Sequence, residues 1–255
     1  MSEKAPDLST TPRLYVEMPL VAGASLTLPP PQSHYLAQVM RRQPGDVVRL
    51  FDGTNGEWAA RVTSVGKKAV TVVLEVQSAP QEVVQDLWLC AAPLKRGRID
   101  WVAEKACELG VARFVPVLTQ RTIVDKLNLD RLRAHMIEAA EQCGRTALPE
   151  MVEPIGLAAL LKGWPAGRHL IFADETGGMP LALALPATQG ASAILIGPEG
   201  AFTDAERAAI RAVPQSLAVS LGPRILRADT AAAVAIGVWQ ALAGDGRGQA
   251  GEPAL

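Results

Sequence analysis

Apolar residues between Arg13 and Val76 fall into short runs separated by glycine-bearing turns. Runs of this length and spacing predict the strands of a small β-barrel or sandwich. A single helical stretch interrupts the series of strands. The predicted elements are strands at 47–51, 57–63 and 69–76 and a helix at about 33–42. The polar segment Gln77–Glu82 is the predicted linker to the rest of the chain.

From Asp86 onward, strand-like apolar runs alternate with stretches in which apolar residues recur at helical spacing. This alternation is typical of an α/β domain with a parallel sheet. Thr203-Asp-Ala-Glu206 is a capping box, which predicts the start of a helix. The predicted strands lie near 87–92, 114–118, 169–173, 193–196 and 217–221, and the predicted helices near 98–109, 132–143, 203–212 and 229–242. We therefore expect two domains between loose tails, with the segments 1–12, 13–78, 79–243 and 244–255 in chain order.

Two of the predicted strands end in glycine–proline turns about 25 residues apart, at Gly197-Pro-Glu-Gly200 and at Gly222-Pro223. The carboxyl ends of parallel strands meet at one edge of a sheet, where nucleotide-like ligands bind in open α/β folds. The pair therefore predicts a pocket made largely of main chain. Neither loop has a phosphate-binding pattern, and Glu199 places a carboxylate inside the first one. We expect a nucleoside-like ligand that is not strongly anionic.

The composition is that of a globular protein with a full core, since 49% of the residues are hydrophobic and 20% are charged. The formal net charge of −1 gives no bulk signal for nucleic-acid binding, so an RNA-binding surface must be a local basic patch. The three cysteines are widely spaced and form no metal-binding pattern with the three histidines. An odd number of separated cysteines is typical of a protein whose thiols stay reduced. No signal peptide and no membrane-spanning run are apparent. We expect a cytoplasmic protein without a metal or a membrane anchor.

The loops Ile196–Phe202 and Leu221–Ala231 resemble the two cofactor-loop motifs of the SPOUT methyltransferases, and more narrowly of the RsmE family, the 16S rRNA (uracil-N3)-methyltransferases. Further matching motifs lie at Arg13–Val16, His34–Arg41, Gly45–Gly53, Lys105–Val111, Pro116–Arg121 and Glu138–Arg145. The resemblance covers about 13–242. It implies an α/β SPOUT domain with a trefoil knot, preceded by a small PUA-like RNA-binding β-barrel. It also implies S-adenosylmethionine as the cofactor and a homodimer that acts on 16S rRNA of the small ribosomal subunit.

The resemblance assigns the backbone of the two loops to the adenine and the ribose of the cofactor. The implied cofactor-binding residues are Leu195, Ile196, Gly197, Pro198, Glu199, Gly200, Leu221, Gly222, Ile225, Leu226 and Arg227. Glycine suits three of these positions because a Cβ would block a close approach or forbid the turn. The chain has Ala201 and Asp229 where the family usually has glycine and glutamate. The alanine narrows the conformations open to the first loop.

Methylation of uracil N3 needs either a general base or a cation that favours the N3 anion, because the neutral imide is a poor nucleophile. Arg227 and Arg224 can act only as the cation, since a guanidinium keeps its proton. We predict that Arg227 stabilises the anion, and Glu199 and Asp229 are the candidate bases. An ion pair of Arg227 with either carboxylate, which would only hold the loop, is the alternative interpretation.

The candidate RNA-binding residues come from family positions and from a triple cation that precedes a predicted helix. Positive charge at a helix N-terminus opposes the helix dipole, and an incoming phosphate would offset that cost. A solvated helix start is the alternative. The candidates are Arg13, His34, Arg41, Arg42, Lys95, Arg96, Arg98, Arg121, Gln142 and Arg145.

Two other functions remain open at this point. A SPOUT enzyme with another RNA target, such as a tRNA 2′-O-methyltransferase, would share the pocket but need different acceptor chemistry. A non-catalytic ribosome-binding factor would have a vestigial pocket that does not bind S-adenosylmethionine. The alanine-rich stretch Ala231–Ile236 is the candidate dimer contact, because small residues permit close approach.

Overall fold

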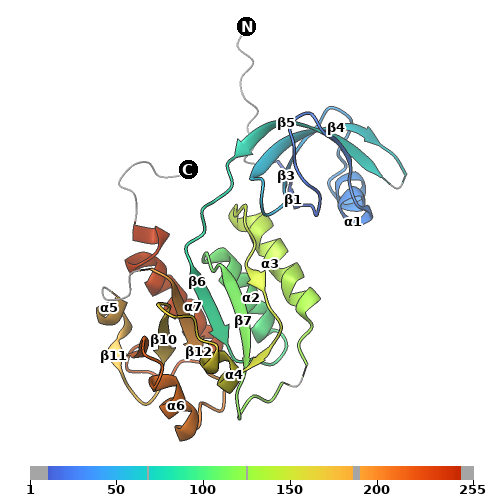
Figure 1. Cartoon of the computed structure of the whole chain (residues 1–255). Coiled ribbons are helices and arrows are strands. Elements are labelled where there is room, and N and C mark those ends of the chain that lie inside the picture. The colour runs from blue at the N-terminus through green and yellow to red at the C-terminus, as the bar shows by residue number, and fades with distance from the viewer. Residues whose placement is uncertain (1–10, 68, 125, 186–189, 248–255) are drawn as a thin grey trace. The chain divides into compact units, whose positions relative to one another are not determined.

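The computed structural model describes residues 11–67, 69–124, 126–185 and 190–247. The chain divides into two compact units, which are coloured by residue number in Figure 1. Unit 1 comprises Met1–Val83 together with Ala140–Leu148, and unit 2 comprises Val84–Ala139 together with Pro149–Leu255. Most of the two tails predicted from the sequence lies outside the described residues.

Unit 1 contains a five-stranded sheet with the order β1-β3-β4-β5-β2. Its strands are β1 (Arg13–Tyr15), β2 (Ser25–Thr27), β3 (Val47–Phe51), β4 (Glu57–Val65) and β5 (Val70–Ala79). β1 pairs parallel to β3, whereas the other pairs are antiparallel. Val48, Leu50 and Val72 are fully buried at alternate strand positions, as in a sheet with one face on a core. The three strands predicted here are confirmed to within three residues at their ends.

The helix predicted at 33–42 is shorter and less regular than expected. α1 (Pro30–His34) has proline in its first turn, where a missing N–H costs nothing. It continues into a π-helical turn at Tyr35–Val39. The hydroxyl of Ser33 accepts a hydrogen bond from the Val70 N–H, which ties this segment to β5.

Unit 2 contains a parallel sheet with the order β11-β13-β10-β12-β6-β7-β8, and β9 pairs with β7. Its strands are β6 (Leu87–Ala91), β7 (Arg113–Leu118), β8 (Glu150–Met151), β9 (Ile155–Gly156), β10 (His169–Ala173), β11 (Met179–Pro180), β12 (Ser192–Ile196) and β13 (Ser216–Ser220). Every residue of β12 is buried, which is typical of a strand covered on both faces. The α/β class with a parallel sheet is therefore confirmed.

The helices are α2 (Arg98–Glu108), α3 (Leu129–Cys143), α4 (Leu157–Lys162), α5 (Leu181–Ala184), α6 (Asp204–Arg211) and α7 (Ala228–Leu242). The capping box of α6 is confirmed. The Glu206 carboxylate accepts from the Thr203 N–H at 2.9 Å, and the Thr203 hydroxyl accepts from the Glu206 N–H. α3 begins three residues earlier than predicted because Asn128 caps it by accepting from the Arg131 N–H at 2.9 Å.

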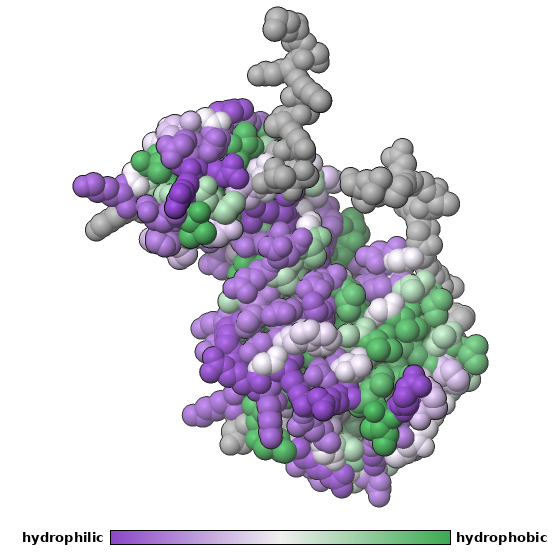
Figure 2. All heavy atoms as spheres, turned by 180° about the vertical axis from the view of Figure 1, so that it is seen from behind, coloured by the Kyte–Doolittle hydropathy of each residue, from purple (hydrophilic) through white to green (hydrophobic). Residues whose placement is uncertain are grey.

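Exposed apolar side chains gather on one side of unit 2, and Figure 2 shows an apolar area there. The large apolar side chains exposed on β11, α5 and α7 are Met179, Leu183, Val234 and Leu242. α5 packs against both β11 and α7, which brings these elements together. Within the part of the chain that the structure describes, no helix combines the length and the apolar character needed to cross a bilayer.

Candidate functional site

A pocket of about 430 Å³ lies at the carboxyl ends of the parallel strands in unit 2. The loops that follow β10, β12 and β13 enclose it. β10 lies between β12 and β13, so this strand order brings the three loops to one place at the sheet edge. The volume is within the range of about 300–1,000 Å³ that is usual for small-molecule sites.

Most of the predicted cofactor-binding residues line this pocket. They are Ile196, Gly197, Pro198, Glu199, Leu221, Gly222, Ile225, Leu226 and Arg227. Leu195 does not line it, because its side chain is fully buried in the core of unit 2. Gly200 lies against Arg121 instead, whose guanidinium donates to the Gly200 carbonyl oxygen at 2.9 Å.

Two residues of the loop after β12 have backbone requirements that the structure explains. A Cβ on Gly197 would lie 2.7 Å from the Phe202 ring. That ring is buried and packs edge-on against Phe172, with the centroids 5.3 Å apart. Ala201 has a φ of 60°, in the left-handed region that favours glycine. The expected conformational limit at Ala201 is thus present as backbone strain.

The third loop, after β10, was missed by the sequence reasoning. Asp174 and Glu175 line the pocket beside the two predicted loops. The buried Asp174 carboxylate accepts from the N–H and the hydroxyl of Thr176, at 2.9 and 2.8 Å, and from the Arg211 guanidinium. The signal for this loop was present, because Asp-Glu-Thr-Gly-Gly follows the apolar run His169–Ala173 directly.

The Asp174 carboxylate is held in its charged form. Burial would raise the pKa of Asp174, but the hydrogen bonds from Thr176 and Arg211 outweigh it and keep the pKa below its usual value. The neighbouring Glu175 pairs with Arg207. Arg207 and Arg211 both belong to α6, so this helix fixes the loop after β10.

The predicted catalytic carboxylates, Glu199 and Asp229, both lie near Arg98, whereas Arg227 does not pair with either of them. Glu199 lines the pocket, and Asp229 lies in the first turn of α7, next to pocket-lining Ala228. The Arg98 guanidinium bonds the Glu199 carboxylate, and its Nε lies 3.9 Å from Asp229 Oδ2. Among the described residues, Arg227 forms no ion pair. The alternative ion pair of Arg227 with one of these carboxylates is thus not formed in the structure, where Arg98 faces both carboxylates instead.

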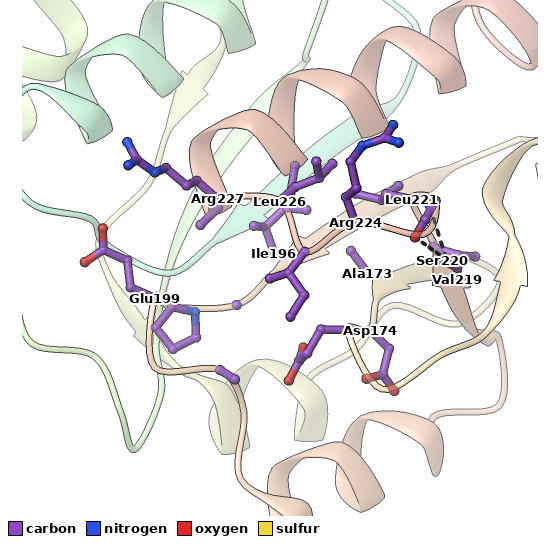
Figure 3. Close-up of a pocket in the computed structure, with 18 of the residues that line it drawn as sticks. Ala173, Asp174, Ile196, Glu199, Val219, Ser220, Leu221, Arg224, Leu226 and Arg227 are labelled. Atoms are coloured by element: carbon purple, nitrogen blue, oxygen red, sulfur yellow. Dashed lines mark hydrogen bonds between the residues drawn. The ribbon is translucent and has the colours of Figure 1, made fainter.

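Figure 3 shows how charged groups are distributed around the pocket. The guanidinium groups of Arg224 and Arg227 lie on one side of it, and the Asp174 carboxylate lies on the other. Both arginines are exposed. The pocket thus combines apolar and main-chain walls with carboxylates as well as guanidinium groups, which suits a nucleoside-like ligand that carries charges of both signs.

Two candidate RNA-binding residues are buried inside unit 1. Arg13 bonds the Glu57 carboxylate and the Ala140 carbonyl oxygen, and its guanidinium stacks 3.9 Å from the ring centroid of Phe51. Arg145 is 8% exposed, and its Nε lies 2.7 Å from Glu82 Oε1. These side chains hold the segment 140–148 within unit 1, and their interpretation as surface contacts to RNA does not fit this placement.

The other RNA candidates lie at the surface or at the pocket. His34 and Arg41 are exposed and Arg42 is half-buried, all within or just after the helical segment 30–39 of unit 1. Gln142 is exposed in unit 1, and Lys95, Arg96 and Arg121 are exposed in unit 2. Arg98 lines the pocket. At the start of α2 the Asp100 carboxylate accepts from the Gly97 N–H at 3.1 Å, so the helix already has an anionic cap there.

The fold and the site define a class. A parallel α/β sheet with a loop-lined pocket beyond its strands is typical of proteins that bind nucleoside-like ligands. Among the described residues, no group of histidine, cysteine and carboxylate side chains could hold a metal ion. The family of RNA methyltransferase domains matches residues 81–240, and the family of RNA methyltransferase PUA domains matches residues 28–75.

Individual relatives narrow the class. The ribosomal RNA small subunit methyltransferase E of Synechocystis sp. is 31% identical over 236 residues, which cover 90% of this chain and 77% of that protein. The chain belongs to the RsmE family, as the sequence resemblance implied.

Solved structures agree with this assignment. A ribosomal RNA small subunit methyltransferase E from Neisseria gonorrhoeae, bound to S-adenosyl methionine, has a TM-score of 0.81 and 28% identity. The match covers 91% of this chain and 98% of that one. A methyltransferase from Legionella pneumophila in complex with its bound cofactor SAM has a TM-score of 0.79 and 31% identity, with 91% and 97% covered.

Proposed function

We propose that this chain transfers a methyl group from S-adenosylmethionine to N3 of a uridine in 16S rRNA. The observation that carries the proposal is the pocket at the carboxyl ends of β10, β12 and β13. It is lined by both loops whose motifs resemble those of the RsmE family. Relatives named for small-subunit rRNA methylation, and a neighbour bound to S-adenosyl methionine, support it. The relatives reported above do not support the tRNA or the non-catalytic alternative in the same way.

Arg227 is the proposed catalytic cation. In the reaction the bond between the methyl carbon and sulfur breaks as the N3–carbon bond forms, and a neutral thioether leaves. The N3 proton must depart first or together with this step, to a base or to water. Arg227 is exposed at the pocket rim and has no carboxylate partner among the described residues, so its charge is free to stabilise the uracil anion. Glu199 and Asp229 remain the candidate proton acceptors.

Unit 1 is the proposed RNA-binding domain. N3 lies on the Watson–Crick edge of the base, so the uridine must be unpaired or extruded from its stack. In unit 1 the cations at 34–42 and Gln142 would contact the RNA. In unit 2 the cations that precede α2 and Arg121 would bind phosphates as well. Binding of this kind weakens steeply with salt because counterions are released on association.

We also propose that the enzyme is a cytoplasmic homodimer with a trefoil knot, as the family resemblance implies. The exposed apolar side chains of β11, α5 and α7 support a dimer contact on unit 2. Within the stretch Ala231–Ile236, Ala231, Ala232, Ala235 and Ile236 are buried within the protomer, so Val234 is the exposed large side chain that this stretch would bring to the proposed contact. Light scattering of the purified chain would give twice the monomer mass if the proposal is right.

The test of the function is methyl transfer to purified small ribosomal subunits with labelled S-adenosylmethionine. We expect Arg227→Ala to lower the rate roughly 100-fold or more, as for removal of one group that stabilises a developing anion. Its affinity for the cofactor should stay within about threefold, a factor worth about 0.7 kcal/mol. Lys162→Ala, which removes an exposed cation of α4, is the matched control. A wild-type rate for Arg227→Ala would rule out its catalytic role. In a parallel assay that offers total tRNA, label in the tRNA but none in the 16S rRNA of the subunits would refute the proposed substrate.

A further inference from the structure

Arg98 occupies an unusual place for a residue expected to bind RNA. It is the first residue of α2, about 100 positions before the cofactor loops in the chain, yet it lines the pocket. Its guanidinium bonds the carboxylate of Glu199, on the loop after β12. The same guanidinium lies 3.9 Å from Asp229 Oδ2, in the first turn of the helix that follows the β13 loop. One side chain therefore joins both loops.

The backbone that carries Arg98 is itself held in place. The Asp100 carboxylate accepts from the Gly97 N–H at 3.1 Å and from Arg131 Nε at 3.0 Å. Asp100 is 8% exposed, so these contacts are shielded from water. α2 also packs against α7, the helix that begins at the end of the β13 loop. The backbone of Arg98 is thus fixed, so its side chain can hold in place two loops that are separate in the chain.

We propose that Arg98 is a positioning residue for the cofactor, because it ties the two cofactor loops together through Glu199 and Asp229. The inference rests on the proposed function, in which these loops hold S-adenosylmethionine. A loop that is already fixed loses less conformational entropy when its ligand binds, so the tie raises affinity without contacting the reacting atoms.

The combined charge of the Arg98, Glu199 and Asp229 side chains decides which ligand can test the positioning role of Arg98. Two carboxylates and one guanidinium carry a formal charge of −1, and loss of Arg98 would leave −2. That change would attract the sulfonium cofactor, whose net charge is positive, and would mask a loss of loop order. S-adenosylhomocysteine has the same adenosine and amino-acid parts but a neutral thioether, so its binding reports the positioning alone.

The experiment is calorimetric binding of S-adenosylhomocysteine and of S-adenosylmethionine to the full chain. Arg98 and Glu199 are about one-third exposed, so each ion pair is weak, and two pairs together predict a loss of about threefold to tenfold in affinity for Arg98→Ala. Arg98→Lys should recover part of that loss.

Matched variants keep the test interpretable. Arg61→Ala removes an arginine that pairs with Glu75 at similar exposure in unit 1, and it should leave the affinity unchanged. If Arg98→Ala fails to fold, the double variant Glu199→Gln/Asp229→Asn breaks the same tie from the other side and should show the same loss.

Three results would overturn the proposal or its basis. Wild-type affinity for S-adenosylhomocysteine in both Arg98→Ala and the double variant would refute the tie. Unchanged cofactor affinity with weaker retention of rRNA would instead make Arg98 the RNA contact that the sequence suggested. Absence of binding heat for both ligands with the wild-type chain would refute the proposed function and, with it, this inference.

Discussion

Replacing Gly197 by alanine is the sharpest test of how the first cofactor loop is built. The added Cβ would lie 2.7 Å from the Phe202 ring, whereas carbon atoms in contact are usually about 3.5–4.0 Å apart. One partner must therefore move by about 1 Å. Phe202 is 1% exposed and packs on Phe172, so the ring has little room to yield. Overpacking of this kind costs about 1–3 kcal/mol, and movement of the loop instead would deform the pocket.

The assay combines urea unfolding with calorimetric binding of S-adenosylmethionine. Gly197→Ala should lower the free energy of unfolding by about 1–3 kcal/mol, weaken cofactor binding, or do both. Gly156→Ala is the control, because nothing lies within 4 Å of its Cβ position and its φ is −66°. The double variant Gly197→Ala/Phe202→Leu should lose less than the sum of its single changes. Wild-type stability together with wild-type affinity in Gly197→Ala would refute the reasoning.

Three further predictions follow from single residues. Ala201→Gly should raise the free energy of unfolding, measured in urea, by about 0.5–1 kcal/mol. The strain that glycine relieves at the left-handed φ is larger than the stability lost because glycine makes the unfolded chain more flexible. A loss of stability would contradict this. The lowered pKa of Asp174 gives stability that is present above its unfolded pKa and lost as pH falls through the folded one. Asp174→Asn should therefore flatten the fall in stability between about pH 5 and pH 3, and an unchanged slope would argue against it. Burial raises the pKa of the Cys90 thiol to about 12 against the opposing charges of Arg168 and Arg113, so alkylation at pH 8 should spare Cys90 in the native chain but not in urea.

The sequence was most informative where chemistry is local. Apolar runs bounded by turns predicted the long strands of both units, and the capping box at Thr203 predicted the start of α6 within one residue. Both glycine loops lie at the pocket, as their position after buried strands indicated. β8, β9 and β11 were not predicted, because strands of two residues are too short to show any periodicity.

The sequence was least informative about which distant side chains meet. Arg13 and Arg145 look like surface cations in the sequence, but each is buried against a carboxylate far away in the chain. Arg98 belongs to a run of cations, yet its partner Glu199 lies 101 residues further on. Ion pairs between distant residues depend on the order of the strands in the sheet, and the pattern of apolar and polar residues does not specify that order. The turn after β10 is visible in the sequence, but its place at the pocket depends on the insertion of β10 between β12 and β13, which brings Asp174 there.

The proposed activity is tested most directly by mass-spectrometric mapping of 16S rRNA from cells with and without this protein. The account predicts that one N3-methyluridine disappears from the 16S rRNA of cells lacking it. That modification should return when the wild-type chain is supplied, but not with Arg227→Ala. An identical set of 16S rRNA modifications in both kinds of cell would contradict the account.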